Sequence, residues 1–549
     1  MYIETTRKIN KIGKEVVKHL LRESYREGKK VKKRTLANLS AYSESEIILV
    51  KQILSVKRNK KGKNTDYLLG DIKTKQGYSI GAFYLLSELL SDLGIVKALG
   101  KSRNGTLAIF QIIFRIIHQA SRASSMRLAN SYPVKEVLGL EDIKLAELYN
   151  NLEWLYENQE RIEKLLFDFK YKDGKVPENI YLYDITSSYF EGTENELSAF
   201  GYNRDKKKGK KQIVIGALTD QNGYLISIKV FKGNTLDFKT VSEQLNDIEN
   251  RFNGVSITFV GDRGMIKSAQ IEDTYNHKLH YITGISKPQL EKLVRDGVIE
   301  KSLFNITLSE VKTDNIRYVL KLNPVLKEST RKSRNERYEK LEKLLNIKNE
   351  YLTEHKRAKV YIAAKNVLKY AQKLKISTWI EIKEDSKNRK LTLIKNEETL
   401  KEKEEFDGCY VLKTDLIDKA ITKEIIHERY KSLQKVERVF RTIKTTHLDI
   451  RPIHLRKENR TRGHVFIAMI SFIVVQELEK RWKKLEYTVK EGITILDRFS
   501  FINIYAKEKY LYSELPTPNK ETKELLEKAN ISIPKRLQLD VDTLRRVVK

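Results

Sequence analysis

The segment Tyr430–Lys444 carries the residues in this chain that are best suited to chemistry. It reads YKSLQKVERVFRTIK, contains no helix breaker and has apolar residues at helical spacing, which predicts one continuous helix. Tyr430, Glu437 and Lys444 are seven residues apart and share one stripe of that helix, which Arg441 joins. A carboxylate among a phenol and two cations can hold a metal ion while its neighbours bind phosphates. In a chain rich in Lys and Glu, the same stripe can also be a solvated charged face.

Two aspartates elsewhere favour the chemical interpretation. Asp184 interrupts the apolar run IYLYDIT, where an uncompensated charge is costly, and Asp262 ends the apolar run FVGDRG between two glycines. Both are predicted at strand ends of one sheet, where ligands commonly bind, although an aspartate before Arg-Gly can also cap a turn. With Glu437 they could hold two divalent cations roughly 4 Å apart for an in-line displacement at phosphorus. Oxygen ligands suit Mg²⁺ or Mn²⁺.

The pattern around Asp184 and Asp262 predicts a mixed α/β domain. Strands are expected at 180–186, 212–219, 224–231, 255–260 and 281–285, with a hairpin turn at 220–223 and helices at 236–252 and about 267–275. The order βββαβαβ, with acids on the first and fourth strands, predicts an RNase H-like domain with a mixed five-stranded sheet.

The remaining chain is predicted to fall into modules around this domain. Residues 1–64 are predicted to form a basic N-terminal DNA-binding module that ends in a basic linker at 57–64. Its β-ribbon at 16–23 and 31–39 could lie along DNA, or it could equally be a solvated hairpin. Residues 65–175 form a helical domain. The catalytic domain comprises 176–286 and 421–485. It is interrupted at 287–420 by a mostly β insertion with a long helix or helical hairpin from Ser329, and 486–549 form a C-terminal tail that is a candidate for dimerisation.

Composition limits the class of protein. The 549 residues include 105 Lys and Arg against 73 Asp and Glu, a net charge of +32, which favours a polyanionic partner such as nucleic acid. An AT-rich coding sequence can produce the same bias. The single Cys409 rules out an internal disulfide, and no Cys/His cluster or GxxxxGK[ST] loop indicates zinc or ATP. The N-terminus lacks an apolar signal region, and the apolar run 465–475 is too short to span a bilayer, so a soluble cytoplasmic protein without membrane contact is expected.

The three acidic runs resemble a known family. YDITSSYFEG, FVGDRG and YKSLQKVERVFRTIKT are similar to the three acidic motifs of DDE transposases from bacterial insertion sequences. The third resembles the Y-x₂-R-x₃-E-x₆-K signature of the branch whose RNase H-like domain is split by a β-rich insertion. Tyr430, Glu437 and Lys444 match it, whereas Leu433 replaces the arginine, and Arg441 is the candidate to supply the missing phosphate contact.

The resemblance implies roles for single residues. Asp184, Asp262 and Glu437 would be the catalytic residues and would hold two Mg²⁺ or Mn²⁺ ions, while the DNA phosphate-binding residues would be Tyr430, Lys444 and Arg441. The lysine run 206–211 would approach backbone phosphates without sequence preference.

The resemblance also implies partners and a reaction. The partners would be double-stranded DNA, as terminal inverted repeats and as target, and a second copy of the chain in a synaptic complex near the nucleoid. The reaction would be cleavage at the repeats followed by strand transfer. A hairpin intermediate would place a flipped base on Trp379 or Tyr410, although each of these aromatic residues is more often a core residue.

Two alternative functions remain open from the sequence. One is an RNase H-like nuclease that cuts without joining, which strand-transfer products from pre-cleaved ends would exclude. The other is a DNA-binding protein without catalysis, which the Leu433 departure allows and the presence of all three acids disfavours.

Overall fold

The structure is a computed structural model. It describes residues 2–534 apart from 10–14, 29, 45, 49, 52–53, 55–71, 173–175, 177–178, 193, 206, 253–257, 264, 266–278, 314, 419, 447, 452 and 507–508. The predicted linker 57–64 and the predicted helix 267–275 lie outside these described residues. The chain folds into two compact units, one of Met1–Asp92, Ile109–Leu145 and Gln476–Lys549 and one of Leu93–Ala108 and Ala146–Val475. The domain boundaries predicted from the sequence remain predictions.

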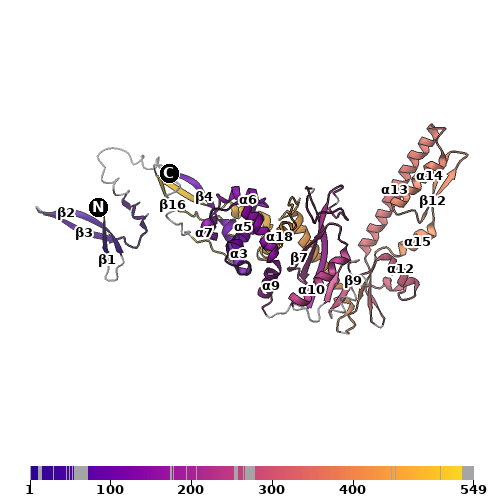
Figure 1. The fold of residues 1–549 in the computed structure, drawn as a ribbon, viewed down its shortest axis with the longest axis horizontal. Helices are drawn as coiled ribbons and strands as arrows, with labels where there is room; N and C mark the ends of the chain where they lie inside the picture. The colour runs from indigo at the N-terminus through magenta and orange to yellow at the C-terminus, as the bar shows by residue number, and fades with distance from the viewer. Residues whose placement is uncertain are drawn as a thin grey trace. The chain divides into compact units, whose positions relative to one another are not determined.

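A three-stranded antiparallel sheet opens the first unit. Its order is β1 (Tyr2–Ile9), β2 (Glu15–Glu27) and β3 (Lys30–Asn38) (Figure 1). The predicted ribbon is confirmed, because β2 pairs with β3 from Glu27 opposite Lys30 onward. Strand β1 was not predicted. Its β-branched residues were the available signal, but these eight residues do not alternate clearly between apolar and polar side chains.

A second sheet of the first unit pairs a strand from the N-terminal part of the chain with two strands from the C-terminal part. Strand β15 (Ser500–Ala506) lies between β16 (Lys509–Glu514) and β4 (Ile72–Ser79), so the predicted C-terminal tail supplies two strands of a sheet. This unit also contains five of the short helices, which are α3 (Gly81–Asp92), α6 (Arg122–Ala129), α7 (Val134–Leu138), α19 (Val489–Asp497) and α20 (Lys520–Lys528). Dimerisation through the tail remains a prediction.

The second unit is built on an eight-stranded mixed sheet of order β10-β11-β14-β9-β8-β5-β6-β7. Strand β5 is parallel to β8, and β8 is parallel to β9, whereas the other neighbours are antiparallel. The strands are β5 (Ile180–Tyr189), β6 (Gln212–Asp220), β7 (Leu225–Lys232), β8 (Thr258–Gly261), β9 (His280–Gly284), β10 (Ser309–Lys312), β11 (Arg317–Leu322) and β14 (Cys409–Thr414). The mixed α/β class and all five predicted catalytic strands are confirmed. The predicted helix 236–252 is the 3₁₀ turn η2 (Asp237–Thr240) followed by α10 (Val241–Arg251).

The hairpin turn between β6 and β7 forms where it was predicted. The Asp220 carboxylate accepts hydrogen bonds from the Asn222 and Tyr224 backbone amides, each at 2.8 Å. Gly223 has φ +80°, a conformation that favours glycine. The turn fixes the register of the two strands, because one carboxylate satisfies both amides that the chain reversal leaves unpaired.

The segment 287–420 differs from the prediction in two ways. Three of its strands, β10, β11 and β14, extend the main sheet and do not form a separate one. The segment is also mostly helical, with α12 (Lys287–Arg295), α13 (Pro324–Glu354), α14 (Val360–Lys373) and α15 (Glu397–Glu405). The predicted strands of this segment do form, but they are short. Most of its regular structure is helical, because the long charged stretch has leucines at helical spacing.

A helical arm projects from this segment. Helices α13 and α14 run side by side and pack with the hairpin β12 (Ile380–Asp385) and β13 (Lys390–Lys395) around a core of their own (Figure 1). Helix α13 begins after Asn323, whose side chain accepts a hydrogen bond from the Leu326 amide, and not at Ser329 as predicted. Pro324 at the first helical position favours this earlier start.

The predicted buried helix at 465–475 is part of α18 (Glu458–Arg481). All eleven residues of the apolar run are buried. The whole helix is long and apolar enough to cross a membrane, but 83% of its most apolar stretch is buried inside the protein, as in the core helix of a soluble protein.

The two faces of β5 have different neighbours. On one face Tyr181 and Tyr183 are fully buried against α10, where their hydroxyls donate to the carbonyls of Phe252 at 2.9 Å and Thr240 at 3.5 Å. Because successive side chains in a strand alternate, Asp184 and Thr186 lie on the opposite face. The tyrosine face thus fixes β5 in the core and leaves the acid on the other side.

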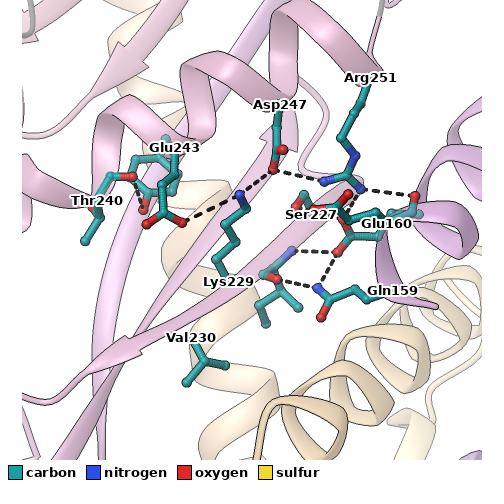
Figure 2. A network of polar contacts seen from close by, with 12 residues as sticks. Gln159, Glu160, Ser227, Lys229, Val230, Thr240, Glu243, Asp247 and Arg251 are labelled. Carbon is teal, nitrogen blue, oxygen red and sulfur yellow. Dashed lines mark hydrogen bonds and ion pairs between the residues drawn. The ribbon is translucent and has the colours of Figure 1, made fainter. Parts of the chain in front are cut away.

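A buried ionic network joins α9 (Gln159–Lys170) to the sheet. Figure 2 shows Lys229 of β7, Asp247 and Arg251 of α10 in a row, with Lys229–Asp247 at 2.9 Å and Asp247–Arg251 at 3.0 Å. Arg251 also contacts Glu163 of α9 at 2.6 Å, and Glu163 is 1% exposed. Burial raises the pKa of Glu163, and the Arg251 charge opposes that shift.

We predict that Arg251→Met destabilises the second unit by about 3–5 kcal/mol, because the variant leaves Glu163 buried without its cation. Urea unfolding followed by tryptophan fluorescence measures the change. The double variant Arg251→Met/Glu163→Gln should recover part of the loss. An effect of Arg251→Met no larger than that of the surface control Arg26→Ala would contradict the prediction.

Candidate active site

Asp184 and Asp262 are neighbours through strand register. The parallel pairing of β5 with β8 ends with Tyr183 opposite Gly261, so the next residue on each chain is one of the two aspartates. Strand β5 continues beyond this level, whereas β8 stops and the chain turns. Asp184 is therefore enclosed within the sheet, and Asp262 is exposed at the end of a strand.

Asp184 is held in an unfavourable electrostatic environment. Burial is the main cause that raises the pKa of Asp184 to about 7, and the charges of Asp262 and Glu437 add to the shift. The Ile185 backbone amide, which donates to the Asp184 carboxylate at 2.7 Å, and the Arg204 charge oppose it. Asp262 and Glu437 therefore both lie close enough to Asp184 for their charges to act on it. A cation placed between them would relieve the repulsion.

The helix predicted at 430–444 is interrupted. It consists of α16 (Lys423–Lys431), a turn at Ser432, α17 (Leu433–Arg441) and a π-helical turn η4 (Thr442–Thr446). The Ser432 hydroxyl donates to the Glu428 carbonyl at 3.1 Å, a bond that competes with the helical ladder and bends helices. The predicted stripe of four residues is thus divided among three elements.

Tyr430 contacts the site from α16. Its hydroxyl donates to the Asp262 carboxylate at 3.1 Å, and burial followed by the Asp262 charge raises the pKa of Tyr430. A Cβ at Gly284 would lie 2.8 Å from this hydroxyl, so the glycine at the end of β9 leaves room for the ring. The contact orients Asp262, which is otherwise exposed.

Glu437 is presented by α17. The apolar side of α17, formed by Leu433, Val436, Val439 and Phe440, is buried, and the helix packs on β5 and β6. Glu437 lies on the exposed side, and its charge acts on Asp184. Leu433, which stands where the family signature has arginine, is 8% exposed and belongs to the apolar side.

Lys444 is already bonded within the protein. Its ammonium contacts the Asp205 carboxylate at 2.6 Å and donates to the Thr186 hydroxyl at 3.0 Å. Arg451 contacts the same Asp205 oxygen at 2.6 Å. Burial lowers the pKa of Lys444, and Asp205 opposes that shift. Sequence reasoning missed Asp205, whose only local signal is an acid immediately before a lysine run.

Of two further arginines, Arg204 is seen to act on the acids. Arg441 ends α17 and is exposed. Arg204 contacts both oxygens of Asp237 at 2.8 and 2.9 Å, and its charge lowers the pKa of Asp184. Arg204 was not predicted.

The donor set fits a divalent cation in its chemistry. Asp184 and Asp262 offer hard carboxylate oxygens, and a cation would favour the charged form of Asp184. Among the described residues, no three His, Cys, Asp or Glu side chains are grouped closely enough to hold one ion together. The aspartate pair is therefore the part of the site that is best arranged for metal, and Glu437 acts on it through its charge.

Neither predicted stacking aromatic is freely presented. Trp379 is 4% exposed, belongs to the core of the helical arm and stacks on Tyr338 with the ring centroids 6.1 Å apart. Tyr410 is half-buried, and its hydroxyl bonds to the His427 ring at 2.5 Å. The alternative that Trp379 is a core residue is confirmed.

Comparison with known proteins identifies the family of the chain. The family model described as the transposase DDE domain matches residues 176–473, more than half of the chain. The chain therefore belongs to the DDE transposases. Residues 3–68 match the model of the N-terminal domain of IS1634 family transposases, and the two matches together identify an insertion-sequence transposase. Transposases with this domain generally use divalent metal ions.

Other comparisons add little. No curated protein matches the chain. Among solved structures, the cryo-EM structure of the piggyBac transposase synaptic complex with hairpin DNA is 11% identical. The match covers 86% of this chain and 84% of the piggyBac chain, with a TM-score of 0.37. A likeness at this level does not by itself establish a shared fold.

We predict that Asp262→Asn lowers the pKa of Asp184 from about 7, because it removes one of the two like charges. The value should stay above the ordinary 3.8, since burial is the larger cause. NMR titration of ¹³C-labelled aspartate measures it, with Asp184→Asn to assign the signal. The exposed Asp296→Asn is the control, and an equal shift in that variant would refute the prediction.

Proposed function

We propose that this transposase cleaves DNA at the terminal inverted repeats of its own element and joins the freed 3′-hydroxyls to target DNA. The observation that carries the proposal is the closeness of Asp184 and Asp262 at the end of β8, where the charges of Asp262 and of Glu437 on α17 both act on the Asp184 carboxylate. The order β7-β6-β5-β8-β9, three antiparallel strands followed by parallel ones, supports an RNase H-like arrangement. The finer assignment to the branch with the Y-R-E-K signature remains a prediction.

In this proposal the three acids share two ions, Mg²⁺ or Mn²⁺, so that no single ion needs all three carboxylates. The ions would supply charge stabilisation and an activated oxygen nucleophile. Tyr430 keeps the Asp262 carboxylate oriented through its hydroxyl. Asp184 gives up its proton when a cation binds, so metal binding should strengthen as the pH rises through about 7.

We further propose that Tyr430, Lys444 and Arg441 position DNA phosphates. Arg441 is exposed at the end of α17 and is the most accessible of the three. Lys444 would reach a phosphate only by leaving Asp205, which would then keep Arg451 as its partner. The Tyr430 hydroxyl donates its one proton to Asp262, so Tyr430 would donate to a phosphate only by leaving that carboxylate.

The inserted arm offers a second contact for DNA. A pocket of about 380 Å³ beside Trp379 is lined by three hydroxyl-bearing residues and five cations, which are Lys287, Arg334, Arg337, Lys375 and Lys403. Asp407 is the one acid in the lining, and it is paired with Arg334. This charge balance suits a phosphate of double-stranded DNA. The proposal includes a homodimer of the transposase that acts on the two paired ends of the element.

Glu437→Gln should retain binding to the element's ends and abolish metal-dependent cleavage, because it removes one carboxylate of the site without changing the apolar side of α17. Inverted repeats flanking the coding region supply the DNA, and gel assays with Mg²⁺ or Mn²⁺ measure nicking. The exposed Glu424→Gln on α16 is the matched control and should cleave normally. Undiminished nicking by Glu437→Gln would remove the assignment.

A second test separates transposition from simple nuclease action. Pre-cleaved ends incubated with plasmid target and Mg²⁺ should yield joined products with the natural chain and none with Asp184→Asn. The reason is that the same carboxylates serve cleavage and joining. Cleavage without any joined product would favour a nuclease.

A further inference from the structure

The segment between β5 and β6 presents two aromatic rings to solvent. Tyr202 is 81% exposed, the highest fraction of any large hydrophobic side chain in the described part of the chain, and Phe200 is 65% exposed. Single exposed apolar residues are common on protein surfaces. Two rings at alternate positions of one short segment are a different case, because both expose most of their apolar surface to water.

The backbone beneath these rings is firmly held. Ala199 and Gln212 exchange two backbone hydrogen bonds at 3.0 and 3.1 Å, and the buried Gln212 amide donates to the carbonyls of Tyr202 at 3.1 Å and Gly233 at 2.9 Å. A Cβ at Gly201 would lie 2.1 Å from the Gly233 carbonyl oxygen, so only glycine permits this approach. The rings are therefore exposed on a preorganised support, which lowers the entropy cost of binding a ligand.

The surroundings of the rings are cationic. The Arg204 guanidinium lies 5.4 Å from the centre of the Tyr202 ring, and Lys207 and Lys208 are exposed a few residues further on. The nearby acids Asp205 and Asp237 are engaged in ion pairs with cations. Aromatic faces next to compensated acids and exposed cations are typical of single-stranded nucleic-acid sites.

The segment lies at the edge of the sheet that carries the acids. It leaves from the end of β5, which is parallel to β8, and Asp262 follows the same end of β8. Ser187 of β5 accepts a hydrogen bond from the Arg204 amide at 3.0 Å, and Asp205 holds Lys444 beyond α17. The segment with Phe200 and Tyr202 therefore lies at the same end of the sheet as the two aspartates.

We propose that Phe200 and Tyr202 form a stacking platform for unpaired bases of the DNA strand that is cleaved at Asp184 and Asp262. This inference rests on the proposed function. The occupant is an unpaired strand because a duplex exposes the faces of its bases only at its ends, whereas a single strand offers one to every ring. The neighbouring cations make a nucleic acid a better match than a second copy of this basic chain.

The test compares a labelled oligothymidylate of about 20 nucleotides with a blunt duplex of equal length, both by fluorescence anisotropy. Phe200→Ala and Tyr202→Ala should each weaken binding of the single strand about tenfold and change duplex binding by less than about twofold. Tyr202→Phe should bind like the natural chain, since it keeps the ring. The exposed Tyr361→Ala on α14 is the matched control and should change neither probe.

A second measurement locates the contact directly. The same oligonucleotide with 5-iodouracil should cross-link on irradiation to the peptide that contains Phe200 and Tyr202. Both measurements use the full chain with Glu437→Gln, so their outcome does not depend on cleavage. The platform can therefore fail while the catalytic assignment holds, and the catalytic assignment can fail while the platform holds. Unchanged single-strand affinity of the alanine variants, or cross-links only elsewhere, would overturn the platform. A loss of self-association with unchanged DNA affinity would assign the rings to a contact between copies instead.

Discussion

Repulsion among carboxylates at the end of β8 is the constraint on which the rest of the site depends. Register alone brings Asp184 beside Asp262, and α17 adds the charge of Glu437. Burial makes this arrangement costly for Asp184, since a charge removed from water is unfavourable without a counter-charge. The opposite face of β5, sealed by two buried tyrosines, keeps the strand from moving away. The fold therefore holds a position that a cation would stabilise.

A second group of charges surrounds the acids. Asp205 contacts both Lys444 and Arg451, so the turn after α17 and the segment after β5 are tied to one carboxylate. Arg204, one residue earlier, reduces the cost of ionising Asp184. The segment that bears the two exposed rings thus also supplies Arg204 and Asp205 to the site. Through the contact of Asp205 with Lys444 it is connected to the turn that follows α17.

The inserted arm leaves the sheet intact because it departs from and returns to neighbouring strands. Leu322 at the end of β11 pairs with Cys409 at the start of β14, and the Asn323 amide donates to the Gly408 carbonyl at 2.8 Å. The base of the arm is closed by antiparallel pairing, so the helices beyond it can form their own core. Helix α16 follows β14 and brings Tyr430 back to Asp262.

The sequence by itself determined the local features and the family. Asp184 in an apolar strand, the turn at Asp220 and the apolar side of α17 were all predictable, because short-range periodicity records which side of an element is buried. Tertiary structure alone decided which distant groups compensate each charge. The pairing of Lys444 with Asp205, the contact of Tyr430 with Asp262 and the pairing of β4 with β15 join residues far apart in sequence. No periodic pattern records such partners, since a buried charge requires only a counter-charge in space and not one at a fixed spacing along the chain.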